Sequence, residues 1–244
     1  MADFPASVKT LQRDLDGVFA ARLRSLVVYG LRGRPRTHGD DSHGHAQGPM
    51  PTHTLAVVDQ LTADDLRVCS AKVASWHDAG LATPLILASH EFGRSLDVFP
   101  FEFGDILADH VVVAGVNPFD GLRIDAADLR RACEVQARGH LLHLREGYLE
   151  TRGRADALAE LVVHSAPAFA ALVMSVARLD GHEPADAAAA ARAVEHAIGT
   201  GPGTASGTVA LVGVTEIPSA EAERLFPSYL DAVERLVTYV DQWR

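Results

Sequence analysis

Apolar positions in the first half of the chain follow two different spacings. Between residues 6 and 23 they lie three and four positions apart, which predicts an amphipathic helix. Three later runs are short, continuous and rich in branched side chains, as is typical of buried strands. These runs are SLVVYG (25–30), HTLAVVD (53–59) and TPLILAS (83–89).

A fourth apolar run, DVFPFEFGDI (97–106), alternates phenylalanine with other residues. Because successive side chains of a strand point to opposite faces, it predicts a strand with its phenylalanines on one face and Glu102 on the other. Pro100 cannot donate a backbone hydrogen bond, so the strand is expected at a sheet edge or with a bulge. The next run, HVVVAG (110–115), is too short for its pattern to assign.

Helix-end signals bound the segment between the second and third strands. Thr62 is a typical N-cap residue, and Asp65 stands three positions later, where a capping box needs an acceptor. Gly80 follows the last apolar position and is suited to the left-handed residue after a helix. We therefore expect one helix between Thr62 and Gly80.

The second half of the chain has helical spacing almost throughout. An N-cap at Asp125 begins a first helix that ends near Gly153, and a second stretch covers 155–179 with a kink or break at Pro167. A third helix is expected from Pro184 to Gly199, then a flexible loop to 208, a strand or helical turn, and a last helix over 219–243. The whole predicts an α+β chain, with a small mixed-sheet domain over residues 1–120 and a helical bundle over 121–244.

Composition excludes several function classes. The net charge of −10 disfavours nucleic acid and anionic membranes as partners at neutral pH. No uncharged apolar run reaches the roughly 18 residues of a membrane helix, and no export signal is visible at the N-terminus. Cys69 and Cys133 lie in apolar stretches and are expected to be reduced core residues, so we expect a cytoplasmic protein.

The sequence also lacks the common catalytic signatures. It contains no G-x-S-x-G, Walker A, H-E-x-x-H or C-x-x-C motif. Serine hydrolysis, P-loop phosphate binding, zinc-protease chemistry and thiol redox chemistry therefore have no support.

The order of helix, SLVVYG, loop and HTLAVVD resembles the entry of the nucleotidyltransferase fold, as in the kanamycin nucleotidyltransferase type. The helical second half resembles the bundle that follows the catalytic domain in those enzymes. SLDVFPFEFGDI (95–106) with LRRACEVQARGHLLHLREGYL (129–149) is similar to a group of bacterial nucleotidyltransferase-like proteins. The resemblance extends from about residue 16 to the C-terminus and implies a nucleotidyltransferase-like domain followed by a helical bundle.

The resemblance also implies where catalytic residues would lie. The motif is Gly-Ser, a loop, and Asp-x-Asp on the next strand, whose two carboxylates hold two Mg²⁺ ions. Gly30 occupies the glycine position, but leucine replaces the serine. The acidic positions fall on Thr52 and Thr54, or within a residue of them, and no acid lies between Asp41 and Asp59. A third carboxylate is expected at Glu102 or, as an alternative, Asp97.

A neutral hydroxyl is a weak Mg²⁺ ligand, so the motif predicts a catalytically inactive protein. Such a protein would bind a nucleotide, a phosphate, another small ligand or a protein partner, with no cofactor, and the apolar helix faces allow a homodimer. One alternative is an active enzyme that uses Mg²⁺, Glu102 and loop acids to modify a small hydroxylated molecule or a protein. A second alternative is a pure interaction module.

Three further sets of residues carry binding hypotheses. Arg32, Arg34 and Arg36 follow Gly30, and their guanidinium groups suit a phosphate; the alternative is a solvated basic turn. By resemblance, Arg145 or Glu146 lines the cleft; otherwise both are surface charges. No metal site is predicted; the alternative is a loop site for Zn²⁺, Ni²⁺ or Mn²⁺. Its ligands would come from His38, Asp40, Asp41, His43 and His45.

Overall fold

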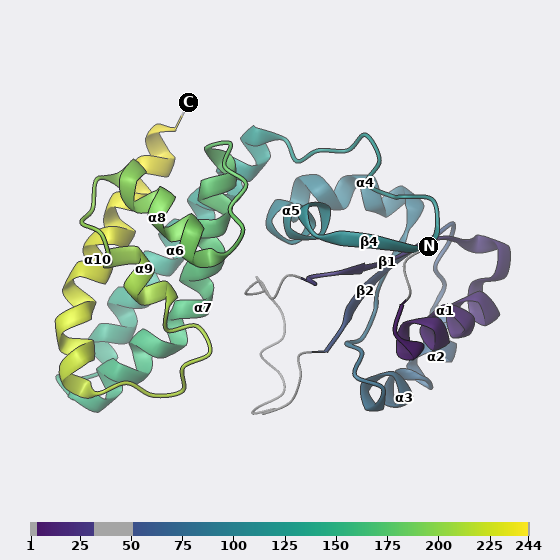
Figure 1. Cartoon of the computed structure of the whole chain (residues 1–244), viewed down its shortest axis with the longest axis horizontal. Helices are drawn as coiled ribbons and strands as arrows, with labels where there is room; N and C mark the ends of the chain where they lie inside the picture. The colour runs from purple at the N-terminus through teal and green to yellow at the C-terminus, as the bar shows by residue number, and fades with distance from the viewer. Residues whose placement is uncertain (1–3, 32–50, 244) are drawn as a thin grey trace. The chain divides into compact units, whose positions relative to one another are not determined.

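The computed structural model describes residues 4–31 and 51–243 (Figure 1). Its first part combines a mixed sheet with helices, and its second part is helical, so the expected α+β class is confirmed. The described residues divide into two compact units. Unit 1 holds residues 4–31 and 51–124, and unit 2 holds residues 125–243.

The sheet of unit 1 has the strand order β3-β2-β1-β4. Strand β1 pairs antiparallel with both β2 and β4, whereas β2 and β3 are parallel. The three strands expected from apolar runs are present, and HVVVAG forms the fourth. Their bounds are β1 Leu23–Tyr29, β2 His53–Val58, β3 Leu85–Ala88 and β4 His110–Gly115.

The run 97–106 is helical, so the prediction of a strand there is wrong. It is divided between α4 (Ser89–Val98) and α5 (Pro100–Ala108). Pro100 occupies the first position of α5, where a missing N–H costs nothing, and Glu102 lies in the first turn, where the helix dipole favours a negative charge. The alternating phenylalanines fit a helix because both Phe101 and Phe103 are buried.

Helices cover both faces of this sheet (Figure 1). Helix α1 (Ala6–Phe19) packs with alternate strand residues, including Ala56 and Val58, in one apolar cluster. The intervening residues Leu55 and Val57 join a second cluster with α4 and α5. The alternation of strand side chains therefore places the sheet between two apolar layers.

The segment from Thr62 to Gly80 forms two helices rather than the expected one. They are α2 (Ala63–Ser70) and α3 (Val73–Asp78). The capping box is confirmed, since the Thr62 hydroxyl accepts from the Asp65 N–H at 3.2 Å and the Asp65 carboxylate accepts from the Thr62 N–H at 3.0 Å. Gly80 follows α3 with φ +77°, as the C-terminal signal predicts.

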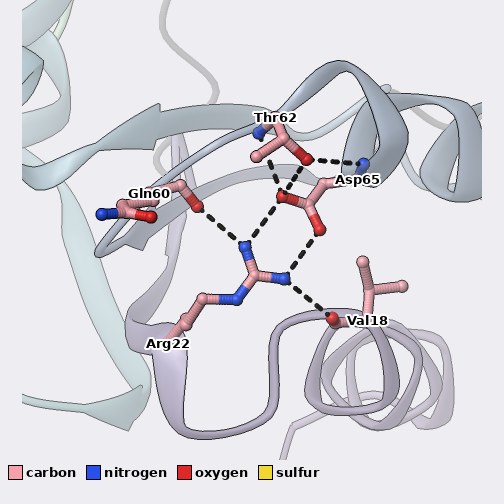
Figure 2. Close-up of polar contacts among 5 residues, drawn as sticks. All are labelled: Val18, Arg22, Gln60, Thr62 and Asp65. Atoms are coloured by element: carbon pink, nitrogen blue, oxygen red, sulfur yellow. Dashed lines mark hydrogen bonds and ion pairs between the residues drawn. The ribbon is translucent and has the colours of Figure 1, made fainter.

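A charged contact fastens this capping box to the start of the sheet (Figure 2). Arg22, the last residue of the 3₁₀ helix η1 (Ala20–Arg22), donates to both oxygens of Asp65 at 2.8 and 2.7 Å. It also donates to the carbonyl oxygens of Gln60 and Val18. The hydrogen bonds from Arg22 are the main reason that the pKa of Asp65 lies far below its ordinary value, although desolvation opposes them.

Unit 2 consists of helices. They are α6 (Ala126–Glu150), α7 (Ala155–Leu179), α8 (Ala187–Ile198), α9 (Thr204–Val209) and α10 (Ser219–Gln242). Helix α7 runs through Pro167, so no break occurs there. Helix α8 begins after the N-cap Asp186 rather than at Pro184, because the Asp186 carboxylate accepts from the Ala189 N–H. Part of the loop expected over 199–208 is helix α9.

Helix α7 forms the core of unit 2. By length and composition it is the one described helix that meets the criteria for crossing a membrane. However, 61% of its apolar window is buried inside the protein. Its apolar surface is thus used for packing with α6, α8 and α10.

Candidate functional site

The candidate site lies at the edge of the sheet where β1 ends and β2 and β4 begin. At this edge Tyr29 is the direct partner of His53 on β2 and of His110 on β4. Gly30 follows Tyr29, and Thr52 immediately precedes β2. The sheet register therefore brings together the glycine and threonine positions that the sequence motif singles out.

Gly30 adopts a backbone conformation that favours glycine, with φ +71°. Its N–H donates to the carbonyl oxygen of Asp109 at 3.1 Å. This donor is used within the sheet edge, so it is not an open N–H of the kind that cradles a phosphate. A Cβ at this position would meet no atom of the described residues within 4 Å.

The two threonines differ in their surroundings. Thr52 is half-buried, and its backbone N–H and carbonyl bond to Gly80 and Ala82 at 2.9 Å each. Thr54 is 1% exposed and shares its face of β2 with Ala56 and Val58. Its hydroxyl oxygen has no hydrogen-bond partner among the residues that the structure describes. Position 54 is an enclosed place in which a charged carboxylate would lack a partner.

Carboxylates are absent from the sheet itself. None of the four strands in the described part of the chain contains an aspartate or a glutamate. Glu102 is half-buried in the first turn of α5, and Asp97 is exposed on α4. The prediction that one of these carboxylates lies on a strand next to β2 is therefore wrong. Sequence reasoning missed Asp109, which lies at the same edge because its carbonyl accepts from Gly30.

Asp109 and His110 are both held within unit 1. Asp109 is 6% exposed. The Nδ1 atom of His110 lies 3.0 Å from the carbonyl oxygen of Ile106, and its Nε2 lies 3.1 Å from Oδ1 of Asn117. Their only sequence signal was their place at the start of the run 110–115, which Asp109 precedes and His110 begins, and which the pattern could not assign.

Comparison with known proteins shows a structural similarity. No family model and no curated protein matches the sequence. Among solved structures, the chain is similar to spectinomycin adenyltransferase AAD(9) from Enterococcus faecialis, solved with ATP and spectinomycin. The TM-score is 0.54, with 97% of this chain and 98% of that chain covered at 11% sequence identity.

This chain has a nucleotidyltransferase-like fold. At 11% identity the similarity concerns the fold alone. Within a nucleotidyltransferase-like fold, two-metal chemistry needs carboxylates paired on neighbouring strand positions. Among the described residues, β2 carries the hydroxyl of Thr54 and no carboxylate, Thr52 lies just before it, and Asp109 lies at the same sheet edge.

The predicted arginines and loop ligands cannot be placed at this edge. Arg32, Arg34 and Arg36 lie outside the described residues, as does the histidine-rich loop. Residues 4–31 and 51–243 hold no group of three or more histidine, cysteine, aspartate or glutamate side chains that suits a metal ion. The predicted loop ligands are His38, Asp40, Asp41, His43 and His45.

In unit 2 the predicted cleft residues make contacts on the helical surface. Arg145 on α6 donates to Glu234 on α10 at 2.7 Å, and Glu146 lies 3.5 Å from His143. Unit 2 also has a cavity of about 300 Å³ between α7 and the segment before α10. No basic residue lines it, so it does not suit a phosphate. Its lining is Asp156, Ala159, Glu160, Val163, Thr215, Glu216, Ile217 and Ser219.

Proposed function

We propose that this protein is a catalytically inactive member of the nucleotidyltransferase-like fold that binds a nucleotide, a phosphate or another small ligand. The observation that carries the proposal is the absence of aspartate and glutamate from all four described strands. In this proposal Thr52 and Thr54, or residues next to them, stand where the motif needs acids, and the enclosed Thr54 hydroxyl has no partner among the described residues. Divalent cations need charged oxygen ligands to stay bound, and neutral hydroxyl groups hold them weakly.

The size of this effect supports inactivity rather than slow catalysis. Two lost carboxylates remove two negative charges that would face two divalent cations. At several kcal/mol for each charged ligand and about 1.4 kcal/mol per tenfold change in rate, the loss amounts to several orders of magnitude.

The ligand is expected to carry a phosphate. Gly30 ends β1 without a described atom within 4 Å of its Cβ position, and Arg32 and Arg34 follow it in the sequence. Guanidinium groups bind phosphate oxygens in a bidentate manner. By the resemblance, Arg145, which pairs with Glu234 within unit 2, stays a proposed ligand contact. ATP is the first ligand to test, because the structurally similar adenyltransferase was solved with it. We further propose a cytoplasmic protein, with a homodimer as a possible assembly.

One observation favours a second candidate, an active metal-dependent nucleotidyltransferase acting on a small hydroxylated molecule or a protein. Asp109 is a carboxylate at the same sheet edge as Gly30. Catalysis by this route requires at least two more acids beside it, which the loop residues Asp40 and Asp41 or Glu102 would have to supply. A pure interaction module remains the third candidate.

Isothermal titration with ATP, with and without Mg²⁺, separates these candidates. Binding that is equally tight without Mg²⁺ supports the inactive binding protein. Binding that requires Mg²⁺, together with AMP transfer to an acceptor, supports the enzyme. Absence of binding supports the interaction module and contradicts our proposal of a nucleotide ligand.

Matched variants sharpen this titration. Arg32→Gln with Arg34→Gln should weaken ATP binding at least tenfold, because two charge-assisted contacts are lost. Arg67→Gln is the control, since Arg67 is an exposed arginine on α2 that pairs with Asp64. Equal weakening in both proteins would show a general effect of net charge instead of a site.

A further inference from the structure

A hydrogen-bonded chain of polar side chains joins three helices inside unit 2. Nε2 of His140 on α6 lies 2.6 Å from the hydroxyl oxygen of Tyr229 on α10. The Tyr229 hydroxyl lies 3.2 Å from the hydroxyl oxygen of Ser165 on α7. The Ser165 hydroxyl in turn donates to the carbonyl oxygen of Val162 at 3.0 Å. This series of hydrogen bonds therefore ends on a carbonyl oxygen, which can only accept a hydrogen bond.

The number of available protons determines which group donates in each of these hydrogen bonds. Two hydroxyl protons are available for three contacts, so the third proton must come from the imidazole. The order is His140 Nε2–H to Tyr229, Tyr229 to Ser165, and Ser165 to Val162. The neutral tautomer with its proton on Nε2 satisfies every contact, and Nδ1 then carries a lone pair.

The surroundings of His140 favour this neutral form. Its ring stacks on Phe169 of α7 at a centroid distance of 5.7 Å, and Tyr229 is fully buried beside it. Burial, and to a smaller extent His143, lower the pKa of His140 to about 4. The titratable groups that face it are His143 on α6 and Tyr229 on α10, while α7 presents Ser165 and Phe169, which do not titrate in this range.

We propose that His140, Tyr229 and Ser165 form an acid-sensitive latch that holds α6, α7 and α10 together. Protonating the half-buried ring places a positive charge against the buried rings of Phe169 and Tyr229. The folded state therefore resists protonation, and acid favours states in which the three helices separate.

The direction of the pH effect follows from the lowered pKa. A histidine in the unfolded state titrates near pH 6.5. Above that pH His140 is neutral in both the folded and the unfolded state, and the latch contributes its full stabilisation. As the pH falls from 6.5 towards 4, the unfolded or opened state gains a proton that the closed state does not bind. The opening equilibrium should rise about 25-fold between pH 7.5 and 5.

Hydrogen exchange measured by mass spectrometry on the full chain tests this latch. After correction for the intrinsic exchange rate, protection of peptides that cover His140 and Tyr229 should fall about 25-fold between pH 7.5 and 5. Peptides of unit 1 provide the internal reference. His140→Gln should remove most of the fall, because glutamine keeps an N–H donor for Tyr229 and does not titrate. His143→Gln is the control, since His143 is an exposed histidine one turn away, and should behave as the wild type.

A fall in protection that is the same in His140→Gln and in the wild type would overturn the proposal. If His140→Gln does not fold, titration of the histidine rings by NMR in the wild-type protein decides. His140 should then remain neutral at a pH where His143 is protonated. Titration of both rings at the same pH would also overturn it.

Discussion

Gly30 and Asp109 are joined by a backbone hydrogen bond, in which the Gly30 N–H donates to the Asp109 carbonyl oxygen at 3.1 Å. The bond closes the sheet edge between the end of β1 and the start of β4. It holds the residue at the glycine position of the nucleotidyltransferase motif in a left-handed conformation, with φ +71°. Among the described residues, this edge is therefore organised by backbone contacts between β1 and the start of β4.

Replacing Gly30 by alanine should lower the free energy of unfolding by about 1 kcal/mol, because an L-residue is strained at this φ angle. No clash adds to this cost, since a Cβ there has open space. Urea denaturation measures the difference. Gly93→Ala is the control, because Gly93 lies inside helix α4 with open space around it and alanine should stabilise that helix. A neutral Gly30→Ala variant would contradict the proposed strain.

Thr54 should respond in opposite ways to two substitutions. Thr54→Val removes an enclosed hydroxyl that has no partner, and should stabilise unit 1 by about 1 kcal/mol. Thr54→Asp buries an unpaired charge and should destabilise it by about 3 kcal/mol or more. Denaturant unfolding, with and without Mg²⁺, measures both effects. A stable Thr54→Asp protein that gains stability from Mg²⁺ would show that a working cation site needs only this one acid.

The contact between Arg22 and Asp65 should matter more than the neighbouring ion pair of Arg24 with Asp59. Arg22→Gln removes donors from a buried carboxylate that also caps α2, whereas Arg24 is a 60% exposed side chain. Thermal unfolding should show a clear loss of stability for Arg22→Gln and a small one for Arg24→Gln. Equal losses would contradict the importance of the cap.

The same contact predicts an acid dependence. Because the pKa of Asp65 is lowered in the folded protein, its contribution to stability is complete above about pH 4 and is lost as the pH falls below that value. Arg22→Gln should therefore flatten the loss of stability below pH 4. Unfolding curves for both proteins between pH 2 and 6 measure it, and parallel curves would contradict the assignment.

Gly115 on β4 should tolerate no side chain. A Cβ built there would lie 2.0 Å from the carbonyl oxygen of Arg24 on β1, in a residue with φ +76°. Gly121 is the matched control, since it has φ +71° and open space. Gly121→Ala should cost about 1 kcal/mol and Gly115→Ala at least about 2 kcal/mol more, because the strands must separate. Similar losses in the two variants would contradict the close approach.

The sequence predicted those parts of the fold in which a local pattern has one structural solution. The apolar runs of β1 and β2 fit buried strands, and the capping box of Thr62 and Asp65 forms as expected. The pattern of phenylalanines around Pro100 is compatible with either a strand or a helix. The alternation suggested a strand, but the segment forms α5, which begins at Pro100 and buries both Phe101 and Phe103.

The candidate site was only partly predictable for a different reason. Gly30, Thr52 and Thr54 could be singled out because the motif is local in sequence, and their role in a site stays a prediction. The place of Asp109 depends on the strand order, and the contact of Arg22 with Asp65 joins residues 43 positions apart. Relationships of this kind follow from the pairing of strands and helices and have no signal in a single segment.

The transfer of AMP from ATP to an acceptor, measured with and without Mg²⁺, tests the central claim most directly. The acceptors should include small hydroxylated molecules and the protein itself. We predict a rate that equals the background without protein and does not respond to Mg²⁺. A rate that rises with both Mg²⁺ and protein concentration would contradict the account, because it would require a set of metal-binding acids that the four strands do not supply.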